Sequence, residues 1–220
     1  MNEPTKEREF DVAIVGAGIA GLMTARQLVA AGRSVIVLDK GRGVGGRMAT
    51  RRSGPVVFDH GAQYFTARDP DFLRLVNAWE QEGLVRQWAR GFATMDGGRK
   101  IDETPRWTGV DGMTCIAKDL AADLNLRLQQ TVTAVRQQTR GWRVALAEGD
   151  SVAAGALLLT PPVPQSLQLL RKGQVQLPHD IRAALERIRY APCLALLIEL
   201  AGPSRVPAPG GLWGDGRPIA

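Results

Sequence analysis

The sequence predicts an α/β fold that opens with a parallel strand, helix and strand, and continues into a second part of mixed sheet and helices. Three observations support this prediction. An apolar run over 11–15 has the composition of a buried strand, and a glycine-rich turn follows it at once. Residues 22–31 then carry apolar side chains at helical spacing, and Gly32 is placed to end that helix in a left-handed conformation. A second β-branched run over 34–38 ends in Asp39 and completes the unit.

The turn after the first strand has the spacing G-x-G-x-x-G. Gly16 allows a sharp turn, Gly18 leaves room for a pyrophosphate beside the backbone, and Gly21 lets the helix pack closely on the sheet. The phosphates would lie at the helix N-terminus, where unpaired N–H groups favour anions. This pattern predicts a Rossmann-like dinucleotide-binding domain. The cofactor-binding residues expected in the turn are Gly16, Ala17, Gly18, Ile19, Ala20 and Gly21.

The residues after the second strand favour FAD. Asp39 is placed to accept hydrogen bonds from an adenosine ribose, and its carboxylate would repel a 2′-phosphate, which favours FAD or NAD over NADP. The loop over 40–52 carries a glycine doublet followed by Arg47. Such a loop can bring backbone and a cation to the same pyrophosphate, which a plain NAD dehydrogenase does not need. The alternative is a solvated basic loop.

Composition excludes several classes of protein. With 45% hydrophobic and 23% charged residues over 220 positions, the chain is expected to fold around a core rather than to be disordered. The formal charge of +6 is spread along the chain, so we expect no nucleic-acid partner. No apolar run approaches the roughly 20 residues of a membrane span. The charged N-terminus, 1–10, lacks the apolar stretch of a secretory signal, so we expect a cytoplasmic protein without a membrane partner.

Other reactive groups are sparse. Cys115 and Cys193 are far apart and are expected to be buried free thiols, and no histidine or cysteine spacing indicates a metal site. Further elements are expected downstream from the apolar patterns. Helices are expected over 69–81, 113–124, 166–170 and 181–188, and strands over 126–128, 131–137, 142–146, 156–160 and 194–200. The strands over 131–137 and 142–146 are expected to pair as a hairpin around Arg140 and Gly141.

Two consecutive stretches carry a family resemblance. The segment DKGRGVGGRMATRR over 39–52, followed by FDHGAQYFTAR over 58–68, closely resembles the renalase-like branch of the flavin amine oxidase superfamily. Later segments resemble that branch's landmarks in the same order, so the likeness covers nearly the whole chain. These segments are GMT over 112–114, TVTAV over 131–135, TPP over 160–162 and YAPC over 190–193.

The resemblance implies a noncovalently bound FAD and a second domain that roofs the flavin. It implies that Gly46 and Arg47 meet the phosphates with the glycine turn, that Asp39 meets the ribose and that Val132 presents its backbone to the adenine. Gly61, Ala62, Gln63 and Tyr64 would run beside the flavin ring, with Gln63 and Tyr64 as the candidate catalytic residues. For Tyr64 a purely structural role in the core is the alternative. The remaining expected cofactor contacts are Lys40, Arg42, Met48, Thr160 and Pro161.

The resemblance also implies a domain division and a reaction. The FAD-binding domain is expected over 1–66 and 106–164, and the substrate domain over 67–105 and 165–220. A turn over 214–218 and a strand beginning at 219 would belong to a substrate domain that is incomplete, because the chain stops short of the family pattern. The implied reaction transfers hydride from a dihydronicotinamide, as the small-molecule substrate, to the flavin, and molecular oxygen is the final acceptor. The alternatives are an amine oxidase or a desaturase of the same superfamily, and a non-catalytic nucleotide-binding fragment.

Overall fold

The computed structural model describes residues 9–214 of the chain. The expected turn over 214–218 and the strand at 219–220 lie outside the described residues except for Gly214, and most of the charged N-terminus, 1–8, also lies outside them. The chain divides into two compact units. The first comprises residues 1–47 and 117–194, and the second comprises residues 48–116 and 195–220.

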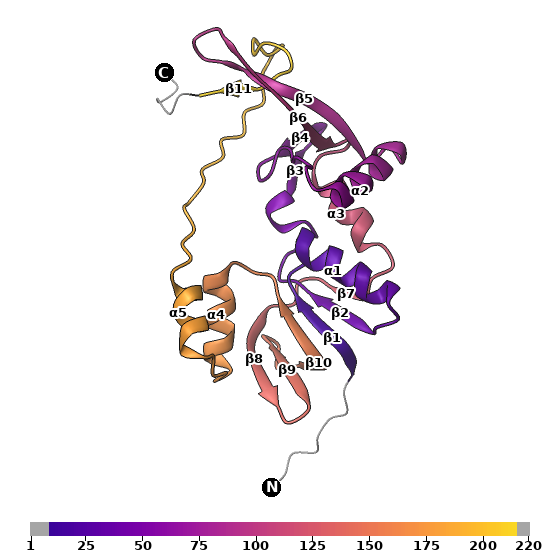
Figure 1. Cartoon of the computed structure of the whole chain (residues 1–220), viewed down its shortest axis with the longest axis vertical. Helices are drawn as coiled ribbons and strands as arrows, with labels where there is room; N and C mark the ends of the chain where they lie inside the picture. Colours follow the sequence, from indigo (N-terminus) through magenta and orange to yellow (C-terminus); the bar gives the residue numbers. More distant parts are fainter. Residues whose placement is uncertain (1–8, 215–220) are drawn as a thin grey trace. The chain divides into compact units, whose positions relative to one another are not determined.

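The first unit is built on a six-stranded mixed sheet with the order β7-β2-β1-β10-β9-β8 (Figure 1). Strands β7, β2, β1 and β10 run parallel, whereas β9 is antiparallel to both β10 and β8. The α/β class predicted from the sequence is confirmed. The strands are β1 (Phe10–Val15), β2 (Val35–Leu38), β7 (Leu126–Arg127), β8 (Val132–Gln138), β9 (Gly141–Leu146) and β10 (Ser151–Leu159).

The core of this sheet follows from the apolar runs of its parallel strands. All four residues of β2 are buried, because a parallel strand is covered on both faces. Helix α1 (Ile19–Ala30) follows β1, and Gly32 just beyond it has φ +74°, as its predicted role in ending the helix requires. Helices α4 (Val163–Lys172) and α5 (His179–Glu186) follow β10, and α4 packs against β8.

The second unit contains two antiparallel hairpins and a helix. β3 (Thr50–Ser53) pairs with β4 (Val56–Asp59), while the long strands β5 (Val85–Thr94) and β6 (Arg99–Gly109) form a sheet that the short β11 (Leu212–Trp213) extends. Helix α2 (Pro70–Gln81) begins at Asp69, whose carboxylate accepts hydrogen bonds from the N–H groups of Asp71 and Phe72. The chain passes from the first unit to the second within the short 3-10 turn η1 (Gly46–Met48), and it returns to the first unit within helix α3 (Thr114–Ala121).

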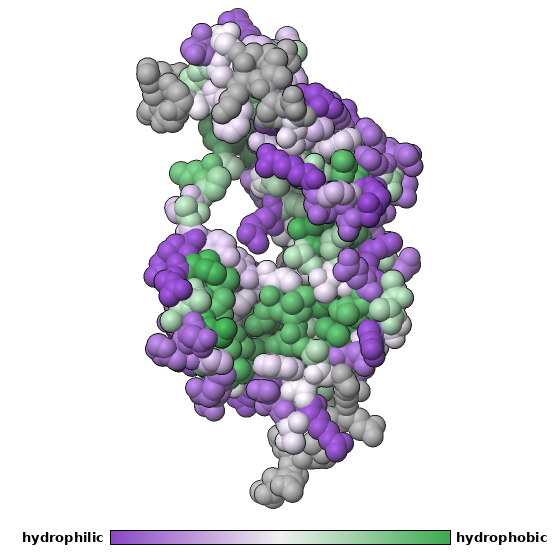
Figure 2. All heavy atoms as spheres, in the orientation of Figure 1, coloured by the Kyte–Doolittle hydropathy of each residue, from purple (hydrophilic) through white to green (hydrophobic). Residues whose placement is uncertain are grey.

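Two sequence predictions are wrong. The strand expected over 194–200 does not form, and the side chains of Leu194 and Leu196 are 98% and 84% exposed. Figure 2 shows hydrophobic surface on this extended segment. A nearly continuous apolar run has β-propensity, but a strand also needs a neighbour whose backbone pairs with it. Both cysteines are free, yet Cys193 is exposed on the same segment and Cys115 is only half-buried, so the prediction that both are buried fails.

The functional division predicted from the sequence stays a prediction. It assigns 1–66 with 106–164 to the cofactor and 67–105 with 165–220 to the substrate, and compactness alone does not report which residues bind either molecule. Over residues 9–214, none of the helices has both the length and the apolar character needed to cross a membrane.

Candidate functional site

The candidate cofactor site lies at one edge of the sheet in the first unit. The glycine turn follows β1, Asp39 follows β2 and Thr160 follows β10. Because these three strands are parallel, their carboxyl ends meet at the same edge, where ligands of open α/β sheets bind. The turn is joined to both neighbours, since Gly16 N–H donates to Leu38 O at 2.8 Å and Thr160 N–H donates to Val15 O at 3.0 Å.

Asp39 is tied to the backbone on both sides of its carboxylate. Oδ2 accepts a hydrogen bond from Ala17 N–H at 2.7 Å, and Oδ1 accepts one from Gly41 N–H at 2.6 Å. The first bond holds the glycine turn, and the second holds the loop that follows β2. A carboxylate oxygen has two lone pairs, so each of the two oxygens can still accept a hydrogen bond from a ribose hydroxyl. Asp39 can therefore shape the site as well as bind the ribose.

Thr160 fixes the start of the glycine turn. Its hydroxyl donates toward Val15 O at 2.9 Å and lies 3.3 Å from Gly16 O. A Cβ built on Gly16 would collide with this hydroxyl, and the φ of +107° at Gly16 is itself one that side chains rarely adopt. The next residue, Pro161, accepts a hydrogen bond at its carbonyl from the Ser166 hydroxyl at 3.0 Å, which links the strand exit to α4.

The three motif glycines have different physical reasons to lack a side chain. A Cβ on Gly21 would collide with the carbonyl oxygen of Gly16, so this position is glycine because the helix lies against the turn. At Gly18, by contrast, a Cβ would meet no atom within 4 Å, and φ is an ordinary −79°. The fold itself does not require glycine at this position. Open space beside the backbone at the start of α1 is what a pyrophosphate needs, so the turn fits the phosphates of a dinucleotide.

The first turn of α1 is suited to an anion. Its N-cap, Gly18, offers no side chain to cap the helix, and the first turn contains no acidic residue that would repel phosphate. Ala17 is buried, Ile19 is half-buried and Ala20 is exposed. The predicted residues of the turn are thus brought together around the helix N-terminus.

The loop after β2 returns to the glycine turn. Gly45 N–H donates to Ala17 O at 2.9 Å, and a Cβ built on Gly46 would lie 3.5 Å from the Cα of Gly18. The loop thus makes a second pass of backbone beside the glycine turn, and its contact with a pyrophosphate stays a prediction. The cations of this loop are Lys40, Arg42 and Arg47, all exposed, and among the described residues none of them forms an ion pair.

The residue predicted to face the adenine opens β8. The chain reaches Val132 along the Asp39 loop, because Gln130 N–H donates to Asp39 O at 2.9 Å and Gln129 N–H donates to Gly41 O at 3.0 Å. Val132 therefore follows directly on a segment bound to the predicted ribose position. Its contact with an adenine stays a prediction.

The residues predicted for the flavin ring belong to the second unit. Gly61, Ala62, Gln63 and Tyr64 form the connection that leaves β4, and Met48 precedes β3. Gly61 and Gln63 are exposed, whereas Ala62 and Tyr64 are half-buried. The connection ends at Phe65, whose backbone exchanges two hydrogen bonds with Trp107 of β6 at 2.9 Å each.

Tyr64 enters a cluster that the sequence did not predict. Its ring packs against Trp88 and Phe92 of β5, with centroids 6.1 and 5.6 Å away, and Arg106 of β6 places its guanidinium carbon 5.5 Å from the ring centroid. We call Tyr64, Trp88, Phe92 and Arg106 the aromatic cluster. The turn sequence Asp96-Gly97-Gly98 between two strand-like runs is the signal that could have revealed the β5–β6 hairpin.

A second unpredicted group fixes the start of the same connection. Asp59 Oδ1 accepts hydrogen bonds from the Thr50 hydroxyl at 2.6 Å and from Met113 N–H at 2.9 Å. Thr50 and Thr114 bond reciprocally, since Thr50 N–H donates to the Thr114 hydroxyl oxygen at 2.6 Å and Thr114 N–H donates to Thr50 Oγ1 at 2.9 Å. We call Thr50, Asp59, Met113 and Thr114 the hairpin clasp. It holds the end of β4, and so the start of the connection over 60–64, against the N-terminus of α3.

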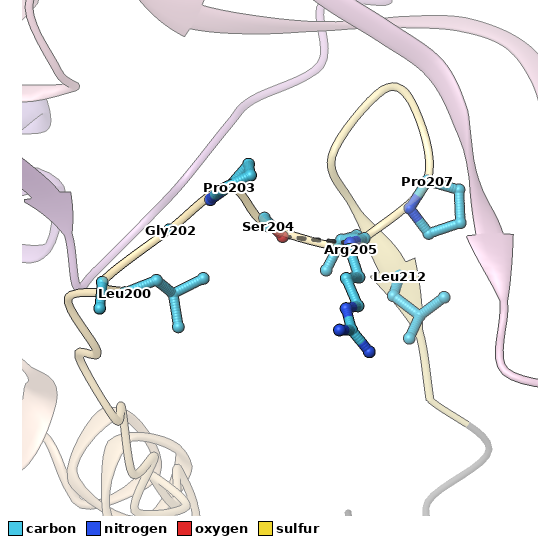
Figure 3. A pocket seen from close by; sticks show the side chains of 9 residues that line it. Leu200, Gly202, Pro203, Ser204, Arg205, Pro207 and Leu212 are labelled. Carbon is cyan, nitrogen blue, oxygen red and sulfur yellow. Dashed lines mark hydrogen bonds between the residues drawn. The ribbon is translucent and has the colours of Figure 1, made fainter.

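The alternatives to this site among the described residues are a metal site and a surface hollow. Among the described residues, no group of three or more His, Cys, Asp or Glu side chains could hold a metal ion. A hollow of about 620 Å³ in the second unit is lined by Leu200–Val206, Pro207 and Leu212, and Figure 3 shows Arg205 as its one charged side chain. A single loop, residues 200–207, forms nearly all of its wall, and none of the predicted site residues lies in that loop.

Comparison with known proteins separates the chain into two matched parts. Residues 14–79 match the NAD(P)-binding Rossmann-like domain, and residues 91–218, more than half of the chain, match the flavin containing amine oxidoreductase family. A putrescine oxidase of Kocuria rosea is 45% identical over 69 residues, which is 31% of this chain and 14% of that protein. A KsdD-like steroid dehydrogenase of Mycolicibacterium smegmatis is 33% identical over 144 residues, which is 66% of this chain and 24% of that protein.

Solved structures confirm the fold. Wild-type putrescine oxidase bound to putrescine superposes with a TM-score of 0.58 at 17% identity, covering 80% of this chain and 63% of that one. A CLA-producing fatty acid isomerase from P. acnes gives a TM-score of 0.63 at 13% identity, covering 83% of this chain and 65% of that one. The chain thus spans about a quarter or less of the two curated relatives and less than two thirds of either solved chain.

Proposed function

Because the chain belongs to the flavin containing amine oxidoreductase family, we propose that it supplies cofactor-binding and substrate-positioning residues to a renalase-like oxidoreductase. FAD is the cofactor that this family membership implies. The proposed substrate is a reduced nicotinamide, and the proposed final acceptor is molecular oxygen. The proposed balance is one dihydronicotinamide, one O2 and one proton giving one oxidised nicotinamide and one hydrogen peroxide.

The observation that carries the cofactor assignment is the open space at Gly18. The fold explains Gly16 and Gly21, because a side chain at either would collide with Thr160 or with the turn itself. It does not explain Gly18, so the absence of a side chain there indicates a ligand that approaches the backbone. Around this space we assign the phosphates to the first turn of α1 and to Arg47, and the ribose to Asp39.

The glycine turn, Asp39 and Arg47 would hold FAD, which would supply the redox chemistry of the reaction. The chain's own residues have the tasks of binding, orienting and excluding water. Gly61 and Ala62 offer a backbone without bulky side chains to the flat ring. Gln63 and Tyr64 are the proposed positioning groups for the substrate, since each carries a polar group and both lie in the connection held by the hairpin clasp. Hydride transfer depends more on orientation than on a strong acid or base.

The renalase-like branch is supported by residues around the cofactor loop. The resemblance rests on DKGRGVGGRMATRR over 39–52 and on FDHGAQYFTAR over 58–68. The structure brings the two stretches into contact within the second unit, where Thr50 of the first bonds to Asp59 of the second. In line with this assignment we propose a cofactor role for 1–66 with 106–164 and a substrate role for 67–105 with 165–220. A cytoplasmic location remains part of the proposal.

An amine oxidase is the second candidate. The likeness to putrescine oxidase favours it, both over 69 residues of sequence and in fold. Two further alternatives are a desaturase of the same superfamily and a nucleotide-binding fragment without catalysis. The desaturase is favoured by a 4,4'-diapophytoene desaturase of Staphylococcus haemolyticus, which is 42% identical over 50 residues.

The experiment that separates these functions is anaerobic mixing. The chain is saturated with FAD, desalted, and mixed with α-NADH, β-NADH and their ring-reduced isomers, and separately with putrescine. We expect the flavin absorbance to bleach with a dihydronicotinamide and to stay unchanged with putrescine. Bleaching by putrescine alone would promote the amine oxidase, and bound flavin that no donor reduces would favour the non-catalytic alternative. The matched control is Gly18→Val, which should carry no flavin and show no absorbance change.

A further inference from the structure

The aromatic cluster of the second unit is occupied by a cation of the chain itself. The guanidinium carbon of Arg106 lies 5.5 Å from the ring centroid of Tyr64 and 5.0 Å from that of Phe92. Trp88 closes the group, with its ring centroid 5.0 Å from that of Phe92. We propose that Arg106 fills the cation-binding position of this cluster and thereby excludes cationic amines from the surroundings of Tyr64.

Arg106 occupies a cation position that Tyr64 and Phe92 share. A cation is attracted to an aromatic face when it lies within about 6 Å of the ring centroid. Arg106 meets this distance for both Tyr64 and Phe92, whose own centroids are 5.6 Å apart. A second cation could bind the ring faces that Arg106 covers only by displacing the guanidinium.

Burial keeps the guanidinium in this position. Arg106 is 7% exposed and Phe92 is 5% exposed, so the surrounding side chains restrict the movement of both. Tyr64, the proposed positioning residue, is half-buried and contacts the guanidinium through its ring.

The consequence concerns the class of substrate, and it rests on the proposed function, which places Tyr64 near the substrate. An ammonium group that approaches the ring faces covered by Arg106 finds the cation–π position already filled. A donor that is not recognised through a cation, such as a dihydronicotinamide, does not depend on that position. Arg106 is thus a specificity-determining residue that disfavours diamines.

The test uses the 220-residue chain and small cations as probes. The Trp88 indole N–H, which donates to Pro209 O at 2.8 Å, provides a signal inside the cluster that nuclear magnetic resonance can follow. Tetramethylammonium and putrescine are titrated into the wild type, Arg106→Met, Arg106→Lys and Arg86→Met. Arg86 is the matched control, because it is an exposed arginine on the same hairpin and lies outside the cluster. A Trp88→Phe variant assigns the signal.

We expect no saturable shift of the Trp88 signal in the wild type, Arg106→Lys or Arg86→Met. Arg106→Met should show a saturable shift with both cations, because the ring faces of Tyr64 and Phe92 are then open to cation–π attraction. Saturable binding of either cation at Trp88 in the wild type would overturn the proposal, whatever the variants do. Equal titrations of Arg106→Met and Arg86→Met would overturn it as well.

Flavin content measured on the same samples separates this proposal from the proposed function. A wild type that binds no FAD would contradict the cofactor assignment, yet its Trp88 titration would still decide whether Arg106 blocks the cluster. Circular dichroism of each variant establishes that the hairpin is folded before the titration is read.

Discussion

The glycine turn of the first unit and the aromatic cluster of the second are encoded in the sequence in opposite ways. The turn is local, since Gly16 to Gly21 are consecutive and their main partner, Asp39, lies 22 positions from Ala17 in the chain. The cluster joins β5, β6 and the connection after β4, and Trp88 reaches across 121 positions to Pro209. A cofactor-binding motif made of neighbouring residues can therefore be predicted from the sequence, whereas a side-chain cluster assembled from distant strands cannot.

Gly21→Ala should have the largest effect, because the turn is then broken from within. The added Cβ would collide with the carbonyl oxygen of Gly16, and backbone cannot move aside as a flexible side chain can. We expect a loss of about 2–4 kcal/mol in the free energy of unfolding, measured by urea titration with circular dichroism. The control is Gly43→Ala, which adds a Cβ in open space and should leave the stability nearly unchanged. Gly32→Ala would not serve, because Gly32 has a positive φ.

Asp39→Ala should follow in size. It removes two hydrogen bonds from backbone N–H groups to a carboxylate, at 2.7 and 2.6 Å, and with them the tie between the turn and the following loop. We expect about 1.5–3 kcal/mol of lost stability and a similar loss of FAD affinity, measured by urea titration and by flavin fluorescence. Asp39→Asn keeps an acceptor oxygen and should lose less. Stability and FAD affinity equal to those of the wild type in Asp39→Ala would contradict both roles.

Asp59→Ala tests the second unit in the same manner. The substitution leaves the Thr50 hydroxyl and Met113 N–H without their shared acceptor, and we expect a loss of about 1–3 kcal/mol in the free energy of unfolding. Hydrogen exchange of Phe65 N–H, which donates to Trp107 O at 2.9 Å, should accelerate, because the clasp fixes the start of the connection that ends at Phe65. Asp111→Ala, at an exposed aspartate near the same helix, serves as the control. Unchanged exchange of Phe65 N–H would show that the clasp does not order the connection.

Asp96→Asn should have the smallest effect, and it depends on pH. The Thr94 side chain and Gly98 N–H hydrogen-bond the Asp96 carboxylate in the turn of the β5–β6 hairpin, and they lower its pKa below the usual 3.8. A lowered folded-state pKa means that this stabilisation is fully present above about 3.8 and is lost as the pH falls through the folded value. The wild type should thus exceed Asp96→Asn slightly in stability at pH 7, and the difference should vanish in acid. Urea titrations at pH 7 and pH 2.5 compare the two.

The sequence predicted the first unit better than the second for a physical reason. Strand, turn and helix over 11–31 follow from spacing and glycine chemistry within a few residues, as does the left-handed Gly32. The β5–β6 hairpin shifts register near Gln87, Ala89 and Gly91, which disturbs the alternation that would have revealed it. The expected strand over 194–200 does not form, because its composition suits a strand but no strand pairs with it among the described residues.

The candidate site divides in the same way. The glycine turn and the loop after β2 could be predicted from local motifs, whereas Thr160 was expected only from the family resemblance, and the structure places it after the parallel strand β10. Arg106 and Asp59 could not be predicted, since their importance depends on partners such as Phe92 and Met113, which only the folded chain brings to them. For Asp39, the sequence predicted hydrogen bonds to a ribose, whereas the two hydrogen bonds from backbone N–H groups became evident only in the structure.

Gly18→Ala tests the proposed cofactor site most directly, through its FAD content measured beside its stability. We propose that the space at Gly18 serves a ligand, because a Cβ there meets no atom of the chain within 4 Å. We expect a free energy of unfolding of the apo chain within about 0.5 kcal/mol of the wild type, together with FAD binding at least about tenfold weaker. Flavin absorbance after equilibrium dialysis and urea titration of the apo chain give the two values. An affinity for FAD equal to that of the wild type, in a variant that folds normally, would contradict the central claim.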